Sequence, residues 1–326
     1  MQGKESSEQE TAGKSSVGID VSKSWLDIHV LPSTATLRVP NTGDGLRKLR
    51  RWLARFDVAL IVVEATGKWH RQACRSLNAD GLQVAVVDPF RVRAFAKAQG
   101  ILAKTDRLDA RVLAFFAAVM NPAIRPPAPE ALENLAELVT ARESAVAEQT
   151  ALKNQLAAAA MSFLKRQLER RCARIAKDIE AIECEIERRI AADQGLARRY
   201  AILTSIPGFG PVVTTTLIAC LAELGTCSRR QIGMLAGLAP IADQSGKREG
   251  IRVIWGGRAK VRRTLYLAAL SAAVHNPAMK TLYQRLISKG KKAKAALIAV
   301  ARKLVVLANT LIAEDRTWQP STPKYA

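Results

Sequence analysis

The sequence predicts an α/β domain, a long helical segment and a second domain that is mostly helical. Short apolar runs alternate with helix-like stretches over residues 17–125, a proline-rich linker follows, and residues 130–192 are rich in Ala, Glu, Leu and Arg. A chain of 326 residues is long enough for more than one domain. We expect a tail at 1–16, the α/β domain at 17–125, linker and coiled-coil helices at 126–199, the second domain at 200–316 and a tail at 317–326.

The first domain is predicted from apolar runs separated by turn residues. The expected strands are Val17–Val21, Trp25–Leu31, Thr36–Val39, Ala59–Val63 and Gln83–Val87. The expected helices are Gly45–Arg55, Lys68–Asn78, Arg91–Gln99 and Thr105–Val119. Along the sequence, three strands joined by short turns come first, and strands that alternate with helices follow. This order implies one sheet with helices packed on it.

The linker contains Asn121-Pro122 and the proline-rich stretch 125–129, which stiffen the chain. Beyond it we expect one or two long helices, because apolar residues recur at spacings of four and three, as in a heptad seam. The seam residues are Leu168, Cys172, Ile175, Ile179, Ile182 and Ile186. This pattern predicts a coiled coil that dimerises the chain, and a helical hairpin within one chain is the alternative.

The charge of the chain indicates a polyanionic partner. The formal net charge is +21, and residues 227–303 hold 17 Lys and Arg residues against two acidic residues. We expect nucleic acid rather than a membrane surface, because no basic amphipathic anchor stands out.

Several other classes of protein are not expected. We expect no bilayer-spanning stretch and no signal peptide in the polar residues 1–16. The five cysteines form no CxxC pair, as in a reduced cytoplasmic protein. His29, His70 and His275 are too dispersed for a histidine metal site and are read as packing or surface residues.

Four acidic residues stand where a metal site for phosphodiester chemistry needs them: Asp20, Glu64, Asp106 and Asp109. Asp20 is embedded in an apolar strand and Glu64 closes another, and an ionised acid there is costly unless it pairs or binds a metal. Asp106 and Asp109 share one face of an expected helix, where a cation would relieve their repulsion. The set predicts a Mg²⁺ site, although each acid alone could be a surface or capping residue.

Two further acids are weaker candidates for this site. Asp27 lies in the second expected strand, and Asp88 precedes Pro89 and is expected to cap a turn.

The second domain opens with two glycines, Gly208 and Gly210, in a turn between helices. Their backbone N–H groups can hold a phosphate, as in a helix-hairpin-helix unit that binds the nucleic-acid backbone without reading sequence. A plain turn between helices is the alternative.

Basic clusters and one serine complete the candidate residues. The basic residues expected to contact phosphates are Lys247, Arg248, Arg258, Lys260, Arg262, Arg263, Lys291, Lys292 and Lys294. A solvated helix face is the alternative for either stretch alone. Ser245 lies beside Lys247 and Arg248, but no nearby histidine can act as its base. From spacing alone, Ser245 is therefore read as a surface-loop serine.

The motifs resemble those of the DEDD transposases of bacterial insertion sequences, which are relatives of the Piv/MooV DNA invertases and are known as bridge-RNA-guided recombinases. The matching segments of the first domain are Gly18–Lys23, Glu64–Gly67 and Lys104–Ala110. Those of the second domain are Ile206–Gly208, Leu235–Leu238, Ser245-Gly246 and Arg262–Tyr266. The similarity runs in consistent order from about residue 17 to residue 312. One departure is Trp255, where many members carry a basic residue, and Trp255 could stack on a base or simply pack.

The resemblance implies an RNase-H-like (RuvC-like) first domain that holds Mg²⁺, or Mn²⁺ in its place, on Asp20, Glu64, Asp106 and Asp109. It implies that Ser245 is a nucleophile that forms a phosphoserine intermediate. It further implies donor and target DNA, a structured bridge RNA from the element, a tetramer in which the serine domain of one subunit meets the carboxylate domain of another, and a nucleoid-associated place in the bacterial cytoplasm.

The expected function is RNA-guided DNA transposition and recombination. A RuvC-like nuclease that uses activated water is one alternative, and a non-enzymatic nucleic-acid binder is another.

Overall fold

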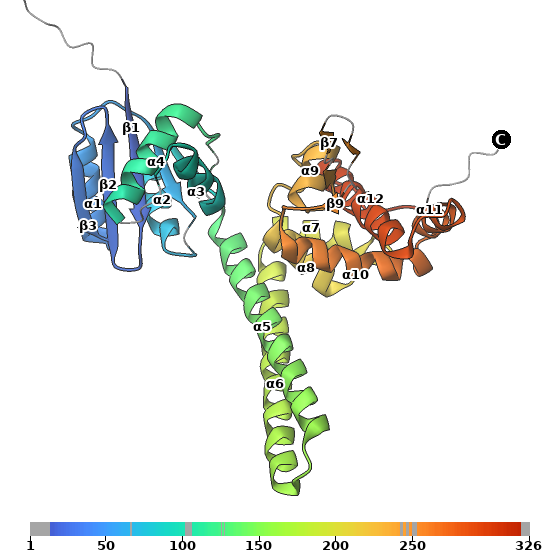
Figure 1. Ribbon diagram of the computed structural model, residues 1–326. Coiled ribbons are helices and arrows are strands. Elements are labelled where there is room, and N and C mark those ends of the chain that lie inside the picture. Colours follow the sequence, from blue (N-terminus) through green and yellow to red (C-terminus); the bar gives the residue numbers. More distant parts are fainter. Residues whose placement is uncertain are drawn as a thin grey trace, which may run out of the picture. The chain divides into compact units, whose positions relative to one another are not determined.

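The structure, a computed structural model, describes residues 14–65, 67–101, 106–124, 126, 128–241, 244–245, 248–249 and 253–320. Side chains are described at these positions except 106–108, 244–245 and 248–249. The chain divides into two units, residues 1–127 and 128–326 (Figure 1).

The first unit is α/β and contains a five-stranded sheet ordered β3-β2-β1-β4-β5. The strands are β1 (Ser15–Val21), β2 (Trp25–Leu31), β3 (Thr36–Pro40), β4 (Val58–Glu64) and β5 (Val84–Val87). Antiparallel pairing joins β1, β2 and β3, while β4 pairs in parallel with β1 and with β5. Each expected strand is present, with ends displaced from the prediction by at most two residues.

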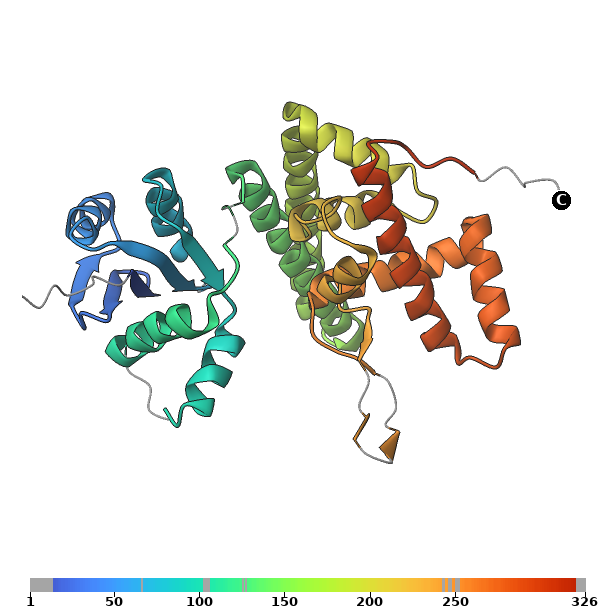
Figure 2. The same cartoon turned by 90° about the horizontal axis from the view of Figure 1, so that it is seen from above.

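Helices cover both faces of this sheet (Figure 2). On one face, α1 (Gly43–Leu53) and α2 (His70–Ala79) enclose a core with the odd-numbered side chains of β1. On the other face, α3 (Pro89–Ala98) and α4 (Asp106–Met120) pack on the even-numbered side chains of β4. This division follows from the alternation of side chains along a strand. The Asp88 carboxylate caps α3 by accepting a hydrogen bond from the backbone N–H of Phe90 at 2.8 Å, so the capping role expected for it is confirmed.

Two long helices, α5 (Glu130–Ala158) and α6 (Ser162–Ala192), pack side by side as a hairpin within the second unit (Figure 1). Arg142 on α5 forms an ion pair with Glu183 on α6 at 2.6 Å. Three of the seam residues, Leu168, Ile179 and Ile186, are buried in the single chain. The structure thus contains the helical hairpin that was the alternative reading, and a dimer formed through these helices stays a prediction.

The rest of the second unit is mostly helical. Its helices are α7 (Gln194–Thr204), α8 (Pro211–Cys220), α9 (Arg229–Leu235), α10 (Ala259–His275), α11 (Pro277–Ser288) and α12 (Ala293–Ala313). Two short strand pairs lie between α9 and α10 in the sequence: β6 (Pro240–Ile241) with β9 (Val253–Ile254), and β7 (Gln244–Ser245) with β8 (Arg248–Glu249). The core of these helices also takes in Leu135 and Val139 of α5 and Ile186 of α6, so the long helices belong to the same unit.

Although no bilayer-spanning stretch is expected from the sequence, one helix, α12, is long and apolar enough to cross a membrane by length and composition. Half of its apolar window is buried, and Val300, Leu304 and Ala308 are fully buried in the core of the second unit. This burial gives α12 the role of a core helix.

Candidate functional site

Asp20 and Glu64 lie at the same end of two neighbouring strands. Asp20 is the penultimate residue of β1 and Glu64 is the last residue of β4. The parallel register pairs Ile19 with Val63, so the residues that follow them, Asp20 and Glu64, lie level with each other. Both are half-buried.

Both acids point to the face of the sheet that α4 covers. A Cβ atom at Gly18 would lie 2.1 Å from the carbonyl oxygen of Ala110, so α4 touches the backbone of β1 there. Because side chains alternate along a strand, Asp20 shares its face with Gly18, and Glu64 shares its face with Val62, which packs against α4. Asp109, also half-buried, directly precedes Ala110. The structure therefore brings Asp20, Glu64 and Asp109 to one face of the sheet.

Asp106, the fourth predicted acid, is the first residue of α4, and its side chain lies outside the described residues. Among the side chains that the structure describes, no three His, Cys, Asp or Glu residues form a group that could hold a metal ion. The kind of donor nevertheless fits a hard divalent cation, because carboxylate oxygens are its preferred protein ligands.

Two buried polar residues of β2 face the same side of the sheet as Asp20. Asp27 lies directly opposite Asp20 in the antiparallel register, and His29 follows two residues later on the same face. Asp27 is only 6% exposed and forms an ion pair with Arg38 at 3.4 Å, which balances its charge. Burial lowers the pKa of His29, and the nearby charge of Arg111 on α4 lowers it further. From the sequence, His29 is expected to be a packing or surface residue, and its place in an alternating strand is the signal that points to this face.

Ser245 belongs to the second unit, where it pairs with Arg248 in the antiparallel ladder of β7 and β8. The side chains of Ser245 and Arg248, and the whole of Lys247, lie outside the described residues. The predicted nucleophile and the predicted acids therefore come from different units of the chain.

The turn between α7 and α8 holds the two glycines that predict a phosphate-binding hairpin. Gly208 has a φ of +103°, and a Cβ atom there would lie 2.7 Å from the Cβ of Ala272 on α10. Glycine at this position is thus required for close packing. Gly210 is exposed and forms the N-cap of α8. A phosphate contact through this turn stays a prediction.

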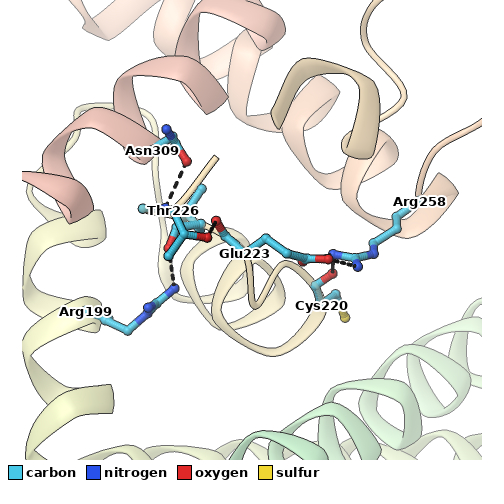
Figure 3. Close-up of polar contacts among 8 residues, drawn as sticks. Arg199, Cys220, Glu223, Thr226, Arg258 and Asn309 are labelled. Atoms are coloured by element: carbon cyan, nitrogen blue, oxygen red, sulfur yellow. Dashed lines mark hydrogen bonds and ion pairs between the residues drawn. The ribbon is translucent and has the colours of Figure 1, made fainter. Parts of the chain in front are cut away.

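Arg258, predicted to contact nucleic acid, is engaged inside the second unit. Its guanidinium donates two hydrogen bonds to the Glu223 carboxylate, at 2.6 and 2.7 Å, and one to the carbonyl oxygen of Cys220 at 3.0 Å (Figure 3). The same loop is held from α12, where the Asn309 side chain accepts a hydrogen bond from the backbone N–H of Gly225 at 2.9 Å. Arg258 therefore joins the loop after α8 to the start of α10.

Three neighbouring basic residues also bind within the chain. Lys260 and Arg263 pair with the same carboxylate, that of Glu143 on α5, at 2.8 and 3.1 Å. Arg262 donates a hydrogen bond to the carbonyl oxygen of Gly256 at 2.6 Å. These contacts give the start of α10 a structural role, and its contacts with nucleic acid stay a prediction.

The other basic cluster is open to solvent. Lys291, Lys292 and Lys294, around the start of α12, are exposed. Trp255 is 67% exposed, so it is not a core residue of its unit.

Comparisons with known proteins identify the family. Residues 17–163 match the DEDD transposase family of IS110, described as a transposase, and residues 200–284 match the transposase family of IS116, IS110 and IS902. Together these matches cover the acids of the first unit and Ser245 of the second.

Curated relatives match the chain in part or over nearly its whole length. The pilin gene-inverting protein of Moraxella bovis is 26% identical over 316 residues, which cover 93% of this chain and 97% of the relative. A 42 kDa protein of insertion element IS900 from Mycobacterium paratuberculosis is 28% identical over 46% of this chain and 39% of the relative. A 43.6 kDa protein of insertion element IS110 from Streptomyces coelicolor is 27% identical over 37% of this chain and 31% of the relative. This chain belongs to the IS110/IS116 family of transposases, which are DNA recombination enzymes.

Proposed function

We propose that this protein is an RNA-guided DNA recombinase that cuts and rejoins strands through a phosphoserine intermediate on Ser245. In this proposal, Asp20, Glu64, Asp106 and Asp109 of an RNase-H-like domain hold Mg²⁺, for which Mn²⁺ can substitute. The observation that supports it most is that Asp20 and Glu64 lie level at the ends of adjacent parallel strands. The face they share is also the face that α4, the helix of Asp106 and Asp109, packs against.

The proposed reaction has two balanced steps. The Ser245 hydroxyl oxygen attacks the scissile phosphorus, its proton leaves to water, and the bond from phosphorus to one sugar oxygen breaks as that oxygen takes up a proton. A sugar hydroxyl of a second strand then attacks the phosphoserine phosphorus and gives its proton to water, while the bond from phosphorus to the Ser245 oxygen breaks as that oxygen takes up a proton, which joins the strands. A bound divalent cation supplies charge neutralisation at the phosphate, and the acids hold it there.

The partners proposed are donor and target DNA, a structured bridge RNA and further copies of the chain. The name of the Moraxella relatives, pilin gene-inverting protein, supports DNA rearrangement as the reaction class. The net charge of +21 supports a polyanionic partner. Because Ser245 and the acids belong to different units, an oligomer in which they meet between subunits is compatible with the chain.

The decisive experiment follows a covalent protein–DNA adduct with end-labelled DNA, bridge RNA and Mg²⁺. Ser245→Ala should bind nucleic acid but form no adduct, and Ser271→Ala, an exposed serine on α10, is the matched control. A normal adduct yield from Ser245→Ala would reject the nucleophile assignment. If Ser245→Ala still cuts DNA while Asp20→Ala does not, the protein is a water-using nuclease. Absence of any metal-dependent cutting would indicate a binding protein.

A further inference from the structure

Trp69, in the first unit, has two lysines close to its ring. The ammonium nitrogens of Lys23 and Lys68 each lie 5.8 Å from the centre of the Trp69 ring. The Trp69 side chain is 39% exposed, and both lysines are exposed. An aromatic ring with two cations beside it combines the two features that bind a single nucleic-acid strand, a stacking surface and a positive charge.

This arrangement stands at the end of the sheet that carries the acids. Lys23 follows Asp20 by three residues, and Trp69 follows Glu64 by five. Asn41 ties the two segments together, because its side-chain amide donates hydrogen bonds to the carbonyl oxygens of Ser22, at 3.0 Å, and Trp69, at 3.2 Å. Trp69 and the two acids therefore belong to the same end of the sheet.

The strengths of the cation–π contacts and of base stacking indicate whether a lysine or a base occupies the face of the Trp69 ring. The two exposed cation–π contacts together are worth roughly a five- to thirtyfold change in an equilibrium constant. Stacking of a base on an aromatic side chain is worth roughly five- to 150-fold. Because stacking extends to larger values than the two contacts together, a base can displace the lysine ammonium groups from the ring, and Lys23 and Lys68 lie close enough to reach for the flanking phosphates.

We propose that Trp69 stacks on an unpaired DNA base next to the scissile phosphate, while Lys23 and Lys68 contact the phosphates on either side. Strand exchange needs such unpaired bases, because a strand must leave one duplex before it joins another. The inference rests on the proposed function for the identity of the strand, and it adds a residue that positions DNA rather than one that reacts.

A second exposed tryptophan provides the matched control. Trp25 is 43% exposed and has the guanidinium of Arg38 over its ring at 5.3 Å. That guanidinium is also paired with the buried Asp27 carboxylate at 3.4 Å, so displacing it breaks an ion pair as well. A base should therefore choose Trp69 over Trp25.

The test is photocrosslinking of the full-length chain to a duplex with a single-stranded tail that carries 5-iododeoxyuridine. EDTA prevents strand cleavage, and mass spectrometry locates the crosslink. We expect it at Trp69, with a loss of at least fivefold in Trp69→Ala, partial retention in Trp69→Phe and no change in Trp25→Phe. Lys23→Met combined with Lys68→Met should reduce the salt dependence of tail binding by about one to two phosphate contacts without moving the crosslink.

Three results would overturn the proposal: a crosslink pattern that omits Trp69, equal losses in the Trp69 and Trp25 variants, or a Trp69 crosslink that forms with RNA in preference to DNA. The crosslink needs no reaction at Ser245, so Ser245→Ala should crosslink normally. A failed nucleophile assignment is thereby distinguished from a failed stacking assignment.

Discussion

Replacing Gly18 with alanine is expected to push α4 away from β1 and to disturb both the stability of the first unit and its acidic site. The added Cβ atom would lie 2.1 Å from Ala110 O, 2.3 Å from Ala114 N and 2.8 Å from Leu113 C, all of them backbone atoms that cannot rotate away. To reach an ordinary contact of 3.4 Å, the helix would have to retreat by about 1.3 Å.

That retreat would loosen the packing of Leu113 and Phe116, which are almost fully buried under the sheet. Overpacking a well-packed core typically costs about 1–3 kcal/mol, and rigid backbone neighbours place Gly18→Ala at the upper end of that range. Because α4 carries Asp109 beside the contact, the same shift would move this carboxylate relative to Asp20. We therefore expect that the variant binds the divalent cation less tightly, so that strand cleavage needs a higher cation concentration, and that its free energy of unfolding is lower.

Hydrogen exchange with mass spectrometry on the intact chain measures the effect locally, and urea unfolding measures it globally. Peptides of α4 and β1 should exchange faster in Gly18→Ala, while those of α10 and α12 in the second unit should not change. Gly43→Ala is the control, because the nearest atom to a Cβ there is the end of the flexible Arg47 side chain at 3.8 Å. Unchanged exchange in α4, together with an unchanged urea midpoint, would refute the close approach of α4 to β1.

Three further predictions concern single residues and one cluster. Because the pKa of His29 is lowered in the folded state, the unfolded state binds more protons below about pH 6.5. Urea stability should therefore fall as the pH drops through that value, and His29→Gln should flatten this dependence; an equal slope in both proteins would contradict it. Arg258→Lys cannot keep both hydrogen bonds to Glu223, so it should lower the free energy of unfolding in urea by about 1–2 kcal/mol. The control is Arg263→Lys, whose side chain is 67% exposed and which should lower it by less than about 1 kcal/mol. Joint replacement of Lys291, Lys292 and Lys294 by Gln should lower the slope of log affinity for DNA against log salt by up to about 2.7, and an unchanged slope would place DNA elsewhere.

The sheet of the first unit could be predicted from the sequence because its signals are local. Short β-rich runs such as Trp25–Leu31 end at turn residues, so the predicted strand ends lie within two residues of the observed ends. The partner of the long helices could not be predicted in the same way. A heptad seam such as the one through Ile179 specifies that an apolar stripe is buried, but not whether α5 of the same chain or another chain covers it.

The partners of the basic residues could not be predicted from the sequence either. Composition gives a large positive charge, yet it does not show that the acid facing Arg258 is Glu223, or that Lys260 reaches Glu143 on α5. These partners are distant in sequence and are brought together only by helix packing. Lys23 and Trp69 are a similar case, because the turn that carries Lys23 and the segment before α2 meet only in the folded sheet. Long-range pairing of this kind decides which basic side chains remain available to nucleic acid.

The three residues Gly18, Ile19 and Asp20 show how one short segment determines both the fold and the site. Alternation sends the Ile19 side chain into the core under α1 and α2, where it is fully buried, and directs Gly18 and Asp20 towards α4. The absence of a side chain at Gly18 lets the backbone of α4 touch the strand, and this contact sets how far the helix acids stand from Asp20. Substitution of Ile19 should therefore act on stability, substitution of Asp20 should remove a carboxylate from the site, and substitution of Gly18 should disturb both the packing and the site. If Gly18→Ala changed stability but left cation-dependent cleavage as it is in the unaltered chain, the contact of α4 with β1 would not position the acids.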